Sequence, residues 1–164
     1  MTGAAYVYSK VTMTLTTNGQ SLAWNRWNID CPGGTVTNGD AMTLGLTTPF
    51  HLNGTWDTNS KTITCLTSYF VGVGTKTLTL GSSIFSFTQW AESSGLTVFN
   101  YNTSTVILTN TNTQFWGVNR TFYNLTFTGI AAITSQFSIS NNCIVTNTLT
   151  ITGANATTQR ALVQ

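Results

Sequence analysis

The sequence has four acidic side chains that could carry general acid–base chemistry: Asp30, Asp40, Asp57 and Glu92. Glycoside cleavage requires two carboxyl groups held roughly 5 to 10 Å apart. Nothing in the sequence brings two of these four residues together as such a pair. Asp40 and Asp57 stand in turn contexts, where Asp usually caps its own backbone, and Asp30 is a polar member of an alternating strand. We therefore expect no catalytic residue and a protein that is not an enzyme.

His51 is the only histidine, and it lies between Phe50 and Leu52. A Ser-His-Asp or Cys-His arrangement would have to use it, yet no nucleophile motif accompanies it. Strand alternation places its side chain on the other face of the strand from Phe50 and Leu52, which predicts an exposed strand histidine. The sequence also lacks the Cys-x-x-Cys pair, the histidine pair and the acidic loop that bind metal ions. We expect no metal and no cofactor.

Three cysteines, Cys31, Cys65 and Cys143, stand far from one another along the chain. An odd number cannot form a closed set of disulfides within one chain. Each cysteine has apolar neighbours, so we interpret all three as buried free thiols. A stacked Cys31–Cys65 pair is the alternative.

The five tryptophans are the best candidates for binding, because aromatic faces bind sugar rings. Most aromatic residues, Trp27 among them, fall on expected strands, where inward stacking accounts for them. Trp56 and Trp90 differ, because each lies beside turn residues and a carboxylate, Asp57 and Glu92 respectively. This context favours exposure, and we predict that Trp56, Asp57, Trp90 and Glu92 contact glycans.

The elements that would position these residues are strands. Apolar and polar residues alternate in seven clear segments: 11–16, 61–65, 76–80, 83–87, 96–99, 124–128 and 148–152. Turn signals such as Asn18-Gly19 and Asn53-Gly54 separate the alternating runs. We count ten or eleven short strands and no helix. The sequence predicts an all-β fold, with sandwich, barrel and solenoid still open.

The polar surface of this fold is nearly uncharged. Lys, Arg, Asp and Glu make up 6% of the chain, against about 25% in a typical soluble domain. Thr (35), Asn (16) and Ser (13) together supply 64 of the 164 residues. Six separated basic residues give no electrostatic footprint for nucleic acid or anionic lipid. No apolar run of about 18 residues is present, so we expect no membrane insertion, and we identify no signal peptide.

An internal repeat favours the solenoid. Residues 11–54 can be aligned with residues 106–153 at an offset that drifts from 94 to 99. A drifting offset suits stacked coils whose loops vary in length, whereas in a sandwich added residues would shift the strand register. Rows of Thr and Asn also suit stacked coils, because like residues on successive coils can form hydrogen-bonded ladders. We expect a single all-β domain over residues 1–164.

Five Thr- and Asn-rich motifs follow one another along the chain, with Trp90 between the second and third: LNGTWDTN (52–59), KTLTLGSS (76–83), YNTSTVILTN (101–110), FYNLTFTG (122–129) and TLTITGAN (148–155). In this order they resemble a repeat family of large Thr-, Asn- and Gly-rich proteins from tailed phages and bacterial surfaces. The resemblance covers most of residues 50–164 and more weakly residues 11–54. It implies a right-handed parallel β-helix, with a β-sandwich as the alternative fold. In that family the segment resembling residues 155–164 runs on into further coils, so we interpret the chain as a fragment, a processed piece or a short member capped by another chain.

The resemblance also implies a function. It suggests a structural component of a phage virion appendage, a tail fibre or tailspike, assembled in the host cytoplasm. The expected partners are further copies of the chain in a homotrimer or fibre, other virion proteins and host surface polysaccharide. The first alternative is a bacterial extracellular adhesin or a self-assembling surface filament subunit. The second is a tailspike-type enzyme that degrades polysaccharide.

Overall fold

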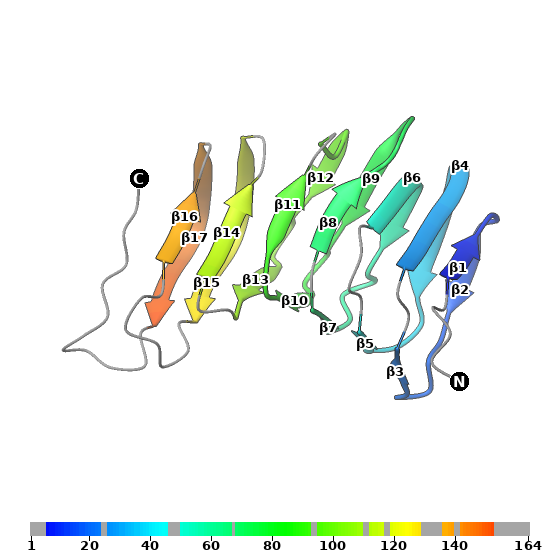
Figure 1. Ribbon diagram of the computed structural model, residues 1–164, viewed down its shortest axis with the longest axis horizontal. Coiled ribbons are helices and arrows are strands. Elements are labelled where there is room, and N and C mark those ends of the chain that lie inside the picture. Colours follow the sequence, from blue (N-terminus) through cyan, green and yellow to red (C-terminus); the bar gives the residue numbers. More distant parts are fainter. Residues whose placement is uncertain are drawn as a thin grey trace.

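The computed structural model describes residues 6–23, 26–45, 50–66, 68–92, 95–109, 112–116, 119–128, 136–139 and 142–152. These residues form 17 strands and no helix. Figure 1 shows the strands stacked in chain order along the long axis, with β1 to β3 at one end and β16 and β17 at the other. The chain winds through three columns of strands in turn and then repeats the circuit one level further on.

The columns belong to two sheets. The first column contains β1 (Tyr6–Ser9), the start of β4 (Arg26–Asn38), the start of β6 (Phe50–Asp57), β8 (Ser68–Val71), β11 (Trp90–Glu92), β14 (Asn112–Trp116) and β16 (Gln136–Ile139). The second contains β2 (Met13–Leu15), the ends of β4 and β6, β9 (Lys76–Thr79) and β12 (Val98–Asn100). The third contains β3 (Ser21–Leu22), β5 (Met42–Leu44), β7 (Ile63–Cys65), β10 (Ile84–Phe87), β13 (Thr105–Leu108), β15 (Arg120–Thr128) and β17 (Cys143–Thr152).

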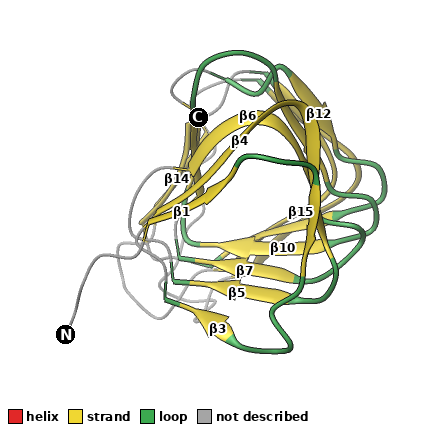
Figure 2. Cartoon of the chain, turned by 90° about the vertical axis from the view of Figure 1, so that its right-hand side faces the viewer, coloured by secondary structure: helices red, strands yellow, loops and turns green. Residues whose placement is uncertain are grey.

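Every strand pair among the described residues is parallel, and partners lie one coil apart. The length of a coil varies along the stack: Val106 pairs with Leu125 one short coil later, whereas Trp90 pairs with Phe115 across a longer one. Viewed from the end, the columns surround a common interior (Figure 2). The predicted β-solenoid is confirmed, and the β-sandwich is excluded, because a sandwich is built from antiparallel sheets.

Two details of the sequence prediction are wrong. The described residues form 17 strands instead of ten or eleven, because strands as short as Ser21–Leu22 are set by pairing with neighbouring coils and carry no alternation of their own. The aligned repeat is also not a structural unit. It matches residues 50–53 of β6, in the ten-stranded sheet, with residues 149–152 of β17, in the seven-stranded sheet. The structural repeat is the single coil.

The interior is filled by ladders of apolar side chains, one from each level. Met42, Ile63, Phe85, Val106 and Leu125 are in register along the third column, and all are buried. Alternation explains the ladder, since side chains two residues apart point to the same face of a strand. Each coil covers the apolar side chains of its neighbours, so stability rests on stacking between coils.

Polar side chains form a second set of links on the outer surface. Asn side chains donate from one coil to the next: Asn53 Nδ2 to Asp30 Oδ1 (3.0 Å), Asn100 Nδ2 to Thr79 Oγ1 (3.1 Å), Asn124 Nδ2 to Thr105 Oγ1 (3.1 Å) and Asn147 Nδ2 to Asn124 Oδ1 (2.8 Å). The predicted ladders therefore rest on the amides. A Thr hydroxyl often donates to a neighbouring coil's backbone instead, as Thr146 Oγ1 does to Phe122 O (3.1 Å).

Tight turns join the second column to the third. In four of them the N–H of residue i+3 donates to the carbonyl of residue i: Gln20 to Thr17 (3.1 Å), Lys61 to Thr58 (2.9 Å), Ser83 to Leu80 (2.9 Å) and Ser104 to Tyr101 (3.0 Å). The first two turns have Asn at a central position with positive φ, 53° at Asn18 and 51° at Asn59. Asn tolerates this left-handed conformation better than most residues. The turn predicted at Asn18-Gly19 is confirmed.

Gly54, at the bend between the two halves of β6, is expected to tolerate no side chain. Its φ is 127°, and a Cβ there would lie 2.4 Å from the carbonyl oxygen of Cys31. Gly54→Ala should lower the free energy of unfolding by about 1 to 3 kcal/mol, as measured by urea denaturation. Gly45→Ala is the matched control, because a Cβ at Gly45 meets its nearest neighbour at 3.6 Å. Equal effects of the two substitutions would contradict the prediction.

Candidate functional site

Trp56 lies in the core. Its side chain is 0% exposed, and its ring packs edge-on against Trp27 (centroids 5.3 Å apart) and Phe85 (5.5 Å). Its indole N–H donates to Asn38 Oδ1 at 2.7 Å. The prediction that Trp56 is exposed is wrong. Trp56 lies four residues after Leu52 on β6, so both side chains point to the inward face of the strand, and the turn begins only after the strand ends. Its indole offers no face to a sugar.

Trp90 is also buried, and it forms a polar cluster with Glu92. The Trp90 ring is 0% exposed, and its indole N–H donates to Glu92 Oε1 at 2.8 Å. The Glu92 side chain is itself 0% exposed. Arg120 approaches the carboxylate with two nitrogens, Nε to Oε1 (2.9 Å) and Nη2 to Oε2 (2.7 Å). The predicted exposure of Trp90 is therefore wrong, and Glu92 is enclosed with it.

The Glu92–Arg120 pair satisfies the hydrogen bonds of its surroundings. Glu92 Oε2 accepts the backbone N–H of Leu96 (2.7 Å), and Arg120 Nη2 donates to Leu96 O (2.7 Å). A buried ion pair is tolerated only when such extra bonds are present. The cluster thus fixes Leu96, just before β12, to β15, one coil away. Arg120 was not among the residues singled out from the sequence.

Asp57 and Asp40 both cap turns, but in different ways. Asp57 Oδ1 accepts the N–H of Asn59 at 2.8 Å, which confirms the predicted cap of its own turn. Asp40 instead caps the turn of the preceding coil, where its carboxylate accepts the Thr17 N–H (2.9 Å) and hydroxyl (3.1 Å) and the Gly19 N–H (3.4 Å). The expectation that Asp40 caps its own backbone is wrong, because stacking brings an earlier turn within reach.

The cap at Asp40 predicts a dependence of stability on pH. The N–H of Thr17 stabilises the carboxylate and lowers the pKa of Asp40 below its ordinary value of about 3.9 in unfolded chains. The cap therefore contributes its full stability above about pH 4, and this contribution is lost as pH falls through the folded pKa. The difference in unfolding free energy between wild type and Asp40→Asn should shrink as pH falls from about 5 to about 2. Urea denaturation across this range measures it, and a constant difference would refute it.

The three cysteines are free thiols. Cys31 and Cys65 are buried, which confirms the prediction for those two, whereas Cys143 is half-buried. Burial raises the pKa of all three thiols, to about 11 for Cys143, and for Cys31 the nearby Asp30 charge adds to the effect. Thiolates are the reactive form, so these side chains suit packing better than nucleophilic chemistry.

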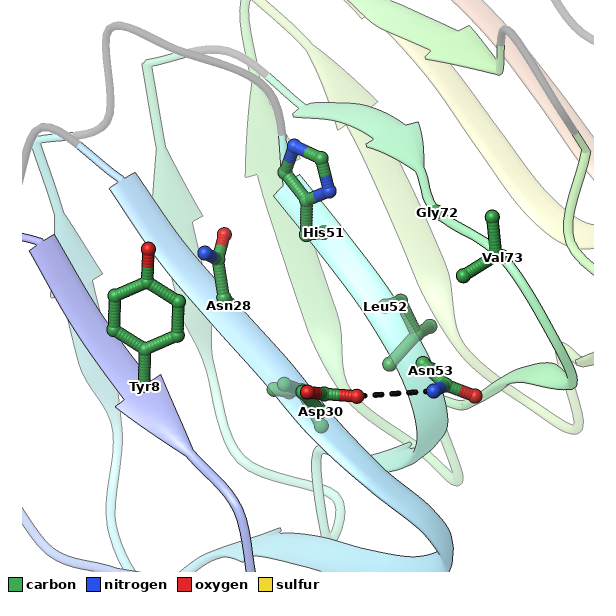
Figure 3. A pocket seen from close by; sticks show the side chains of 9 residues that line it. Tyr8, Asn28, Asp30, His51, Leu52, Asn53, Gly72 and Val73 are labelled. Atoms are coloured by element: carbon green, nitrogen blue, oxygen red, sulfur yellow. Dashed lines mark hydrogen bonds between the residues drawn. The ribbon is translucent and has the colours of Figure 1, made fainter.

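A shallow hollow of about 200 Å³ lies on the outer face of the first column (Figure 3). Two rows of side chains in register form it, one made by Tyr8, Asn28 and His51 and the other by Asp30 and Asn53. The lining comprises Tyr8, Asn28, Ile29, Asp30, His51, Leu52, Asn53, Gly72 and Val73.

His51 sits at one side of this hollow. It is half-buried while Leu52 beside it is fully buried, so the predicted orientation away from Leu52 is confirmed. Burial lowers the pKa of His51, and the positive charge of Arg26 lowers it further. The imidazole is therefore neutral at pH 7, with one nitrogen that donates a hydrogen bond and one that accepts.

The structure does not gather the four sequence-predicted glycan residues into one site. Trp56 and Trp90 are buried, Glu92 is paired with Arg120, and Asp57 caps its turn. The described parts of the chain contain no group of three His, Cys, Asp or Glu side chains placed to hold a metal ion. They also contain no helix of the length and apolarity that a membrane span requires.

Comparisons with protein-family models, with curated proteins and with solved structures gave no match.

Proposed function

We propose that this protein is a non-catalytic structural component of a phage virion appendage, of the tail-fibre or tailspike kind. The observation that carries the proposal is the stack of parallel coils with a filled core. In such a stack each inner strand is hydrogen-bonded to a coil on either side, so the module is rigid along its axis. The resemblance of its motifs to Thr- and Asn-rich phage repeats supports the same role.

The polar surface supports an assembly role as well. Rows of like charge on successive coils would repel each other, whereas Asn and Thr can link coils by hydrogen bonds. The links from Asn124 to Thr105 and from Asn147 to Asn124 are of this kind. A low charge is thus compatible with a long stack in a way that a typical charged surface is not.

A bacterial adhesin or self-assembling surface filament is the second candidate, and one observation favours it. Leu149 and Ile151 on β17 are 52% and 40% exposed, although they stack in register on Leu125 and Phe127, which are buried. Among the described strands β17 is the edge of its sheet. An edge with exposed apolar side chains can accept a further strand, such as one from a second copy.

The third candidate is a polysaccharide-degrading enzyme. Against it, each of the four carboxylates already has a structural role. Asp40 and Asp57 cap turns, Glu92 is buried against Arg120, and Asp30 accepts a bond from Asn53. Incubation with capsule polysaccharide is expected to release no reducing ends. Release that disappears in Asp57→Asn or Glu92→Gln would establish the enzyme instead.

Immunogold electron microscopy with an antibody against the chain tests the first two candidates. The labelled samples are virions and cells from cultures of the producing organism or its host. We expect gold on the appendages of phage particles. Gold on cell surfaces or free filaments would favour the second candidate, and label confined to the soluble fraction would refute both. Sedimentation of the purified chain tests the expected homotrimer, whose mass is three times 17.7 kDa.

A further inference from the structure

The hollow on the first column contains a buried polar group without a partner. Asn28 is 8% exposed, and its Oδ1 atom is buried with no hydrogen bond. Figure 3 shows its amide between the Tyr8 ring and the His51 imidazole, on the same side of the sheet. Buried acceptors without a donor are rare in folded proteins, because their desolvation is uncompensated. The Asn28 amide therefore points to a donor that comes from outside the chain.

The polar groups around Asn28 could serve the same ligand. The Tyr8 hydroxyl and both nitrogens of His51 have no hydrogen-bond partner among the described residues, and Asp30 uses only Oδ1, toward Asn53. The neutral imidazole, the phenol and the amide can each both donate and accept a hydrogen bond, while the second Asp30 oxygen accepts one. Such a set is suited to several hydroxyl groups, each of which is also a donor and an acceptor.

The apolar part of the hollow is exposed. The Tyr8 ring is 57% exposed and Val73 is 79% exposed, so they offer apolar surface beside the polar floor. A sugar ring has the complementary form, with C–H groups on its faces and hydroxyl groups at its edge. The volume of about 200 Å³ is below the roughly 300 to 1,000 Å³ of pockets for drug-sized ligands, and it fits a single ring.

We propose that this hollow, bounded by Tyr8, Asn28, Asp30, His51 and Val73, binds one neutral sugar ring of a saccharide. The Asp30 carboxylate disfavours acidic sugars, because like charges would lie together. The hollow lies on the side of the solenoid, so stacking at either end leaves it open. This binding site goes beyond the proposed structural role and does not depend on it.

The direct test is an NMR titration of the ¹⁵N-labelled full chain. The probes are the methyl glycosides of glucose, galactose, mannose and N-acetylglucosamine, with methyl glucuronide as the acidic counterpart. We expect at least one neutral glycoside to shift the amide signals of the residues that line the hollow, with a Kd in the millimolar range typical of so small a ligand. The absence of shifts with all neutral probes, or tighter binding of the glucuronide, would overturn the proposal.

Two variants show whether the named side chains make the contacts. Asp30→Asn keeps the shape and an acceptor for Asn53 but loses the charge, and it should weaken binding about tenfold. Asn28→Leu should abolish binding while it raises the melting temperature, because it removes the unpaired acceptor. Leu66→Ala, 52% exposed and outside the hollow, is the control and should bind like wild type. Unchanged binding in both variants would refute the site. It would leave the proposed structural role intact, because immunogold labelling tests that role separately.

Discussion

Arg120→Met is expected to lower the free energy of unfolding by about 3 to 5 kcal/mol, because it leaves the Glu92 carboxylate buried without its counter-charge. The side chain of Glu92 is 0% exposed, so water cannot replace the guanidinium without opening the coil. Chemical denaturation followed by circular dichroism measures the effect. Lys10→Met, at an exposed position, should change stability by no more than about 0.5 kcal/mol.

The double variant Glu92→Gln/Arg120→Met separates charge from packing. A Gln side chain carries no charge, yet its oxygen can still accept the Leu96 N–H that Glu92 accepts at 2.7 Å. We therefore expect the double variant to be more stable than Arg120→Met alone. A double variant that is less stable than Arg120→Met, or an Arg120→Met protein as stable as wild type, would show that the Glu92–Arg120 pair contributes little to the stability of the fold.

Trp56→Ala should cost about 3 to 5 kcal/mol, the usual loss when a large buried aromatic side chain is removed. Trp56→Phe should cost less, about 1 to 3 kcal/mol, because it keeps a ring but leaves Asn38 Oδ1 without the donor that now lies at 2.7 Å. Urea denaturation measures both, and Leu66→Ala is the exposed control. If Trp56→Ala were neutral, Trp56 would lie at the surface and the glycan role predicted from the sequence would regain support.

Alternation of residues predicted an all-β fold, and the drifting repeat and the family resemblance favoured the solenoid, but none of these gave the environment of each aromatic side chain. In the run from Leu52 to Trp56, every second residue is buried. Alternation alone therefore places Trp56 inside, and the adjacent turn is the weaker signal. Glu92 likewise points to the same inward face as Trp90, which lies two residues before it on the strand. A charged residue at an inward position is a signal for a buried partner.

The partner itself could not be predicted. Arg120 lies 28 residues after Glu92, and the length of a coil changes from level to level, which leaves no fixed spacing to search for. For the same reason, sequence spacing does not predict that Asp40 caps the turn at Thr17, nor which side chains align to form the hollow. Residues that meet across coils are determined by the accumulated lengths of the turns, which sequence patterns give only to within a few residues.

The one-coil separation of strand partners also has a consequence for how the protein is made. A strand finds the edge that it pairs with as soon as one further coil has been synthesised, which takes about one to five seconds at ribosomal rates. No described strand has to wait for a distant segment, unlike the first strand of many β-sandwiches. The chain can therefore fold level by level as it leaves the ribosome, with each finished coil acting as the template for the next.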